Sequence, residues 1–173
     1  MKKYIAIALA VILASVALPS CTKSDSGNIC GTYHFKMSGN FMCQDIDCSD
    51  TTVTFVLSSQ TGQMHIFEQE DGLYYVSMSV MLGGNVMVFD ATYENNVLRL
   101  CEQEITVGVK EEGSSSITGI QMARSVSLNF SGTGKMYGET LKLDMSCSGE
   151  FGYDDNMYVV TTDQDIVCVA DKN

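Results

Sequence analysis

From residue 31 onward, hydrophobic and polar side chains alternate along most of the chain, which is the period of a β-strand with one buried and one wet face. The segment SVSLNFSG places Val126, Leu128 and Phe130 on one face and Ser127 and Asn129 on the other. The same alternation runs through GTYHFKMSG, TVTFVLSS and ETLKLDMSCSG. No helical stripe longer than a turn or two follows the first twenty residues. The pattern therefore predicts half-buried antiparallel strands.

Turn signals rich in glycine, asparagine and aspartate separate these segments at short intervals. They include Thr61-Gly62, Asp71-Gly72, Gly83-Gly84-Asn85, Glu94-Asn95-Asn96 and Gly132-Thr133-Gly134. The strands expected between them lie at about 31–38, 51–59, 63–70, 73–82, 85–94, 97–109, 123–132, 139–150 and 157–169. The long polar segment EEGSSSITG (111–119) connects two of them.

An open meander of strands leaves the backbone groups of its two edge strands unpaired, and closure into a barrel removes these edges. The sequence therefore predicts an all-β antiparallel meander closed into an eight- to ten-stranded barrel over residues 30–173. A two-sheet sandwich is the alternative, but hairpins outnumber long crossovers and favour the barrel. A membrane-spanning barrel is disfavoured, because strands such as 123–132 are short and rich in serine.

The first twenty residues follow a different pattern. MKKYIAIALAVILASVALPS has two lysines and then an apolar run, which predicts a signal peptide over residues 1–20, too short for a stable spanning helix. The next letters, LPSC (18–21), resemble the lipobox of bacterial lipoproteins. That resemblance implies cleavage before Cys21 and acyl chains on this cysteine. The alternative is a plain signal peptide or a short membrane anchor with an incidental cysteine.

An acylated Cys21 would hold the protein on a membrane, since each buried methylene contributes about 0.8 kcal/mol. Residues 21–29 are mostly small and polar, and they are expected to form a flexible tether. The residue after Cys21 is not aspartate, so retention at the inner membrane, as in enteric bacteria, is not indicated. The expected location is the cell envelope, at the outer membrane.

Charge narrows the choice of partners. Without residues 1–20, the remaining 153 residues carry 8 basic and 21 acidic side chains, a formal net charge of −13. Such a surface repels phosphate, so no nucleic-acid partner is expected, whereas a cationic protein would be attracted.

Catalytic chemistry is not expected. His34 and His65 lie on the strand faces opposite the expected core and have no serine or cysteine partner at a recognisable spacing. The segment GTGK (132–135) lacks the earlier glycine and the following Ser or Thr of a phosphate loop, and it is interpreted as a turn. No acid–base pair was found, and neither an enzyme nor a cofactor is predicted.

Six cysteines follow Cys21, and an even number in an exported chain predicts up to three disulfides with fifteen possible pairings. Cys43 and Cys48 flank a short loop and form the first expected pair. Cys30 and Cys168 bracket the folded region and form the second, provided that the first and last strands are adjacent and antiparallel. Cys101 and Cys147 either pair or stay buried as thiols.

No metal site is predicted, since only Cys43 and Cys48 are clustered and neither histidine stands near them. The acidic loop with Asp45, Asp47 and Asp50 lacks the spacing of a known calcium loop.

The segment LYYVSMSVMLGGNVMVFDATY (73–93) is apolar on both of its faces, unlike its neighbours. Such a hairpin must be covered twice, or must line a cavity and pack against a partner. Methionine adapts to varied shapes, which suits a binding surface. Two interpretations stay open: a fully buried hairpin, or an apolar ligand pocket. The pocket would use Tyr75, Met78, Met81, Met87, Phe89 and Tyr93.

Three segments together resemble the lipocalin-like (calycin-type) β-barrel lipoproteins of Bacteroidota: GTYHFKM, the Tyr- and Met-rich meander, and FSGTGKMYGETLKLDMSCSG. Gly31-x-Tyr33 is similar to the Gly-x-Trp opening of lipocalins, with tyrosine in place of tryptophan. The resemblance spans about residues 29–170 and implies a barrel that encloses a small ligand, without catalytic residues. The expected function is therefore binding of a small apolar molecule by a lipid-anchored protein. The alternative is a protein-interaction module, such as an inhibitor of a cationic enzyme like lysozyme.

Overall fold

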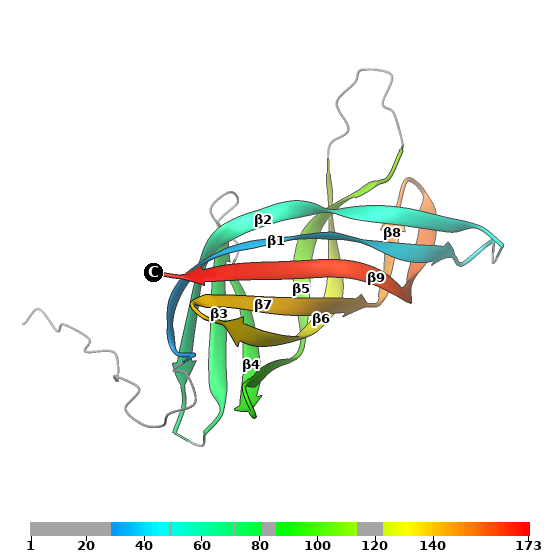
Figure 1. Ribbon diagram of the computed structural model, residues 1–173. Helices are drawn as coiled ribbons and strands as arrows, with labels where there is room; N and C mark the ends of the chain where they lie inside the picture. Colours follow the sequence, from blue (N-terminus) through cyan, green and yellow to red (C-terminus); the bar gives the residue numbers. More distant parts are fainter. Residues whose placement is uncertain (1–28, 49, 71, 81–85, 114–122) are drawn as a thin grey trace, which may run out of the picture.

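The computed structural model describes residues 29–48, 50–70, 72–80, 86–113 and 123–173, and these residues form an antiparallel β-sheet without a helix (Figure 1). The predicted signal peptide, Cys21 and all but the last residue of the predicted tether lie outside the described residues. The strands are β1 (Gly31–Asp45), β2 (Thr52–Glu68), β3 (Tyr74–Val80), β4 (Val86–Glu94), β5 (Val97–Glu111), β6 (Arg124–Tyr137), β7 (Thr140–Ser148), β8 (Glu150–Tyr153) and β9 (Asn156–Lys172). Within these ranges, no helix long and apolar enough to cross a bilayer is found.

Hydrogen bonds connect eight of the strands into a ring. The order is β1-β2-β3-β4-β5-β6-β7-β9, and β9 pairs again with β1, while the short β8 pairs with β9 alone. The amide of Asn173 donates to the carbonyl of Thr32 at 2.9 Å, so the two ends of the folded region meet. The predicted all-β antiparallel meander is confirmed, with nine strands and a barrel-like closure.

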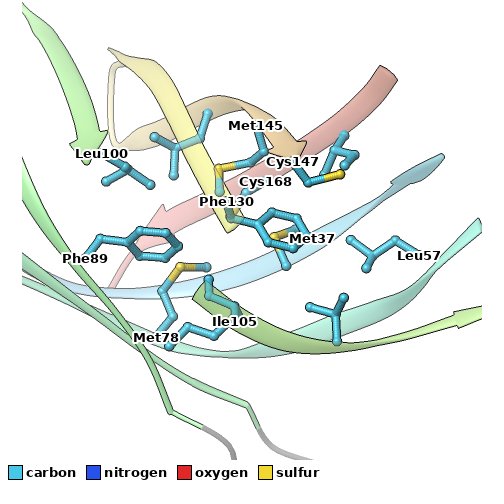
Figure 2. Close-up of a cluster of buried hydrophobic side chains, with 14 of the residues drawn as sticks. Met37, Leu57, Met78, Phe89, Leu100, Ile105, Phe130, Met145, Cys147 and Cys168 are labelled. Atoms are coloured by element: carbon cyan, nitrogen blue, oxygen red, sulfur yellow. The ribbon is translucent and has the colours of Figure 1, made fainter. Parts of the chain in front are cut away.

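The interior of this ring is filled by its own side chains. The alternating positions predicted to face inward in β1, β6 and β7 are buried, and no polar or charged residue of the described part belongs to the buried set. Figure 2 shows side chains from opposite walls meeting in one cluster, including Met37 of β1, Phe89 of β4 and Phe130 of β6. The described core is a packed apolar cluster.

Both ends of the barrel are closed by packed side chains. At the end that holds the β8–β9 hairpin, the ring of Phe55 lies 5.0–5.2 Å from the rings of three aromatic residues: Phe151, Tyr153 and Tyr158. At the other end, the hydroxyl of Tyr33 donates to the carbonyl of Ile29 at 2.5 Å, and Ile29 is buried there.

Two predicted turns prove to be wrong. Thr61-Gly62 lies inside β2, where a side chain on Gly62 would collide with the backbone carbonyl of Ser79 in β3. Gly132-Thr133-Gly134 lies inside β6, where a Cβ on Gly134 would come 2.5 Å from the carbonyl oxygen of Lys142. These glycines serve close approach between neighbouring strands, and they do not reverse the chain. The real turn after β6 uses Gly138, whose φ is 65°.

Candidate functional site

The β3–β4 hairpin supplies three of the predicted ligand residues to the packed core. Met78, Met87 and Phe89 are each at most 4% exposed and point inward. Figure 2 shows Met78 and Phe89 in the same cluster as Ile105 of β5. These three residues lie together as predicted, but they are neighbours in a packed interior. An apolar molecule inside the barrel would have to displace them.

The other predicted ligand residues lie elsewhere. Tyr75 is on the outer face of β3, where its ring lies 4.9 Å from that of Phe67. Tyr93 packs against Tyr74 with a ring separation of 5.7 Å, and its hydroxyl donates to Asn96 at 2.7 Å. Burial raises the pKa of Tyr93 above its usual value. Met81 lies outside the described residues. The six residues therefore do not converge on one site.

The predicted Cys30–Cys168 disulfide does not fit the register of the sheet. β1 and β9 are adjacent and antiparallel, as that pairing required, but Cys168 lies opposite Met37. Cys30 is seven residues from Met37, which corresponds to about 23 Å along an extended strand. A disulfide needs Cα atoms about 4.4–6.8 Å apart. The prediction is wrong for this structure.

The predicted Cys43–Cys48 disulfide is also absent, since both residues are free thiols among the described cysteines. Cys43 is buried, whereas Cys48 is exposed and its sulfur accepts a hydrogen bond from the hydroxyl of Thr51 at 3.2 Å. Cys101 is exposed and Cys147 is buried, so that pair is not joined either. Burial raises the pKa of Cys43, Cys147 and Cys168 from 9.0 to about 12 each, so these thiols stay protonated well above neutral pH.

Histidine and acidic clusters do not form a catalytic or metal site in the described part of the chain. His34 is exposed, and His65 shares a hydrogen bond of 3.1 Å with Thr32 on the outer face. The carboxylate of Asp45 accepts the amides of Asp47 and Cys48, which organises the β1–β2 turn. No group of three or more potential metal ligands occurs among the described residues.

The feature that stands out is an opening in the barrel wall between β4 and β5. β4 and β5 pair only from Ala91↔Leu100 to Glu94↔Val97. Further along, residues 109–111 of β5 pair with β2 instead. Between these two points, no described residue pairs with the facing edges of residues 86–90 in β4, 101–108 in β5 and 58–61 in β2. We call the gap bounded by these three segments the wall opening.

Two β-bulges lie on the strands that border the wall opening. In β5, Leu100 lies opposite Gly132 and Gln103 lies opposite Phe130, so β5 has one residue more than β6 in this interval. In β2, Leu57 lies opposite Gly39 of β1 and Gln60 lies opposite Met37, so β2 has one residue more than β1 in this interval. A bulge bends its strand and increases the local twist. We therefore expect the two bulges to help separate β2 and β5 from the β3–β4 hairpin.

The sequence of β5 contains a signal for its bulge. Buried positions fall on even numbers at Leu98 and Leu100 and on odd numbers at Ile105, Val107 and Val109. Between them, residues 101–104 are all exposed. Such a change of phase inside one strand requires an extra residue.

The wall opening contains a hollow of about 370 Å³, which is lined by both apolar and polar residues of β4 and β5. Its apolar lining is Val86, Met87, Val88 and Ile105, and its polar lining is Gln103, Glu104 and Thr106. Asp90, Glu102 and Glu104 are exposed on its two flanking strands, and none pairs with a basic side chain of the described residues. The opening therefore combines strand edges that no described residue pairs with, an apolar strip and negative charge.

No protein-family model matches this chain, and neither does any curated protein. The resemblance to lipocalin-like lipoproteins therefore stays a prediction from the sequence.

Proposed function

We propose that this protein is a non-catalytic, lipid-anchored binding protein of the cell envelope that captures an extended, basic segment of a partner protein at the wall opening. The observation that carries the proposal is the pair of facing strand edges, at residues 86–90 and 103–107, beside exposed carboxylates. Unpaired strand edges bind extended peptides through main-chain hydrogen bonds, and side-chain pockets add specificity.

Charge supports a basic partner. The mature chain would carry a net charge of −13, so it would attract cationic proteins over long distances. Glu102 and Glu104 flank the edge of β5 and would pair with lysine or arginine side chains of an added strand. Alternate apolar side chains of that strand would contact Met87 and Ile105. A cationic enzyme that attacks the envelope, such as lysozyme, is a partner of this kind.

A small apolar ligand inside the barrel is the weaker proposal, because Met78, Met87 and Phe89 occupy the interior. Catalysis is not proposed either. The groups with raised pKa values are core thiols and tyrosines, and burial, which raises these pKa values, makes the groups harder to ionise and poorer nucleophiles. No residue in the wall opening has the nucleophile–base arrangement of a catalytic site.

The test uses an alternating Lys-Val peptide of about eight residues, which is long enough to follow either edge. We expect calorimetry to show binding that weakens with salt, and hydrogen exchange to show protection of the amides at 86–90 or 103–107 on binding. Glu104→Lys should weaken binding about tenfold, equivalent to about 1.4 kcal/mol. The control Glu150→Lys makes the same charge change at an exposed position in β8 and should change binding much less.

Equal weakening by both variants would show that only net charge matters and would refute the wall opening as the site. Absence of peptide binding, together with lipid retained by the protein in native mass spectrometry, would favour the apolar ligand instead. If the peptide binds, lysozyme serves as a second probe. It should compete with the peptide if the protein inhibits a cationic enzyme of this kind.

A further inference from the structure

The topology fixes which end of the barrel is tied to the predicted lipid anchor. β1 begins at Gly31, which lies opposite Ile66 near the end of β2, and Tyr33 lies opposite Lys172 near the end of β9. The turns β2–β3, β4–β5 and β6–β7 lie at this same end, to the left and lower left in Figure 1. We call this end the N-terminal rim and the end with the β1–β2 and β8–β9 turns the opposite rim.

We infer that the N-terminal rim contacts the lipid bilayer through its exposed apolar side chains; the inference rests on the acylation of Cys21 in the proposed function. Eight residue steps separate Cys21 from Ile29, so covalent geometry limits the connection to at most about 28 Å. β1 alone, from Gly31 to Asp45, extends over about 50 Å. The tether is thus too short to let an upright barrel touch the bilayer with its opposite rim.

The N-terminal rim has the side chains that such a contact needs. Phe67 is 39% exposed, Leu73 is 44% exposed and Tyr137 is 64% exposed, and they come from the β2–β3 and β6–β7 hairpins. Tyrosine suits the boundary between water and hydrocarbon, because its ring is apolar and its hydroxyl is polar. The opposite rim also exposes apolar side chains, at Ile46 and Met157. Exposure alone therefore does not choose between the rims, and the position of the tether does.

A short tether makes a weak surface contact sufficient. An anchored domain samples the bilayer at a high effective concentration, so a few apolar side chains can hold one orientation without binding to membranes by themselves. Glu68 and Glu139 beside the apolar side chains oppose anionic headgroups. The contact is therefore expected with zwitterionic lipid and should weaken as anionic lipid is added.

The test exploits the absence of tryptophan from the chain. Leu73→Trp and Met157→Trp each introduce one fluorophore, at positions that are 44% and 43% exposed on the N-terminal and opposite rims. The full chain, produced in a host that acylates it, is reconstituted in phosphatidylcholine vesicles with brominated acyl chains. We expect Leu73→Trp to lose about half of its emission, as for a side chain at the headgroup–acyl boundary, and Met157→Trp to keep nearly all of it.

The outcomes separate the anchor from the orientation. If Leu73→Trp and Met157→Trp do not float with vesicles, or if Cys21→Ser floats equally, the lipid anchor is refuted and the inference falls with it. If both tryptophan variants float and Leu73→Trp is not quenched, or Met157→Trp is quenched as much, only the orientation is refuted. Matching unfolding curves for the two variants confirm that each fluorophore reports on a folded barrel.

Discussion

Gly62 of β2 lies so close to the main-chain carbonyl of Ser79 in β3 that no side chain fits between them. The two strands pair from Gly62↔Val80 to Glu68↔Tyr74, so this contact lies at the end of their ladder. It is also where β2 leaves β3 at the edge of the wall opening. The missing side chain of Gly62 thus lets the β3–β4 hairpin pack closely on β2.

Gly62→Ala should therefore destabilise the protein by about 1–3 kcal/mol, because the added methyl group must push β3 away. Urea unfolding measured by circular dichroism gives the change in free energy. Gly152→Ala in β8 is the matched control, since its Cβ would meet nothing nearer than the sulfur of Met157 at 3.5 Å. Equal stability of the Gly62→Ala protein and the native protein would contradict the close packing of β2 and β3.

Phe55→Ala should cost about 3–5 kcal/mol, because it empties the centre of the aromatic cluster that closes one end of the barrel. The ring of Phe55 is fully buried and lies beside four other aromatic rings, including that of Phe41 at 6.1 Å. Phe67→Ala removes a ring that is 39% exposed and should cost much less. A similar loss in the two variants would show that the cluster is not a stabilising plug.

Stability should fall at alkaline pH. Burial raises the pKa of the Cys43, Cys147 and Cys168 thiols from 9.0 to about 12. The folded state therefore holds these protons more tightly, and the stabilisation is complete below pH 9 and is lost as pH rises toward about 12. Tyr33, whose pKa is raised from 10.0 to about 12, acts in the same direction.

The measurement is the free energy of unfolding in urea between about pH 8 and pH 11, with a reductant present. Cys168→Ala removes one buried thiol and should make the fall with pH shallower, by at most about 1.4 kcal/mol per pH unit. Cys101→Ala removes an exposed thiol and should leave the slope unchanged. If both variants keep the native slope, the buried thiols do not control the alkaline loss.

Thiol labelling should distinguish the cysteines by position. With native, reduced protein, Cys48 and Cys101 should react quickly with a water-soluble maleimide, because both are exposed. Cys43, Cys147 and Cys168 should react only after unfolding, since they are buried and protonated. Peptide mapping by mass spectrometry identifies the labelled sites. A Cys30–Cys168 disulfide in a peptide map of protein that has not been reduced would contradict the register between β1 and β9.

Deletion of Glu102 tests the origin of the wall opening. Without this residue, one residue would separate Leu100 from Gln103, just as one residue separates Gly132 from Phe130 in β6. The bulge would then disappear. A straighter β5 should continue along β4 and narrow the opening. We expect slower amide exchange at residues 86–90 and weaker binding of the Lys-Val peptide. Unchanged exchange in a folded deletion variant would show that the bulge does not hold the strands apart.

Alternation alone was enough to assign the inward faces of several strands. Tyr33, Phe35 and Met37 in β1, and Val126, Leu128 and Phe130 in β6, are buried as the pattern predicted. This works because a strand with one wet face displays its orientation in its own sequence. In the return strand of the apolar hairpin, Met87 and Phe89 face inward and Val86 faces outward, but a segment that is apolar on both faces does not reveal this orientation in its sequence.

Glycine misled the prediction of strand ends. Gly62 and Gly134 carry the same local signal as a turn, but their function depends on the neighbouring strand, which a single sequence does not reveal. The register that separates Cys30 from Cys168 could not be predicted from a single sequence either. It is set by pairing between residues more than a hundred positions apart. The wall opening also depends on non-local pairing, although the phase change between Leu100 and Ile105 was visible.

The seam between the first and last strands determines when this protein can fold. β1 pairs with β9 from Tyr33↔Lys172 to Asp45↔Tyr158, so the ring stays incomplete until β9 has been synthesised. Contacts between such distant positions form slowly, and until then β1 presents an unsatisfied edge. A ribosome-bound chain that lacks β9 therefore has no closed intermediate. Loss of β9 would leave the edges of β1 and β7 unpaired, and an open sheet of this kind is prone to aggregation.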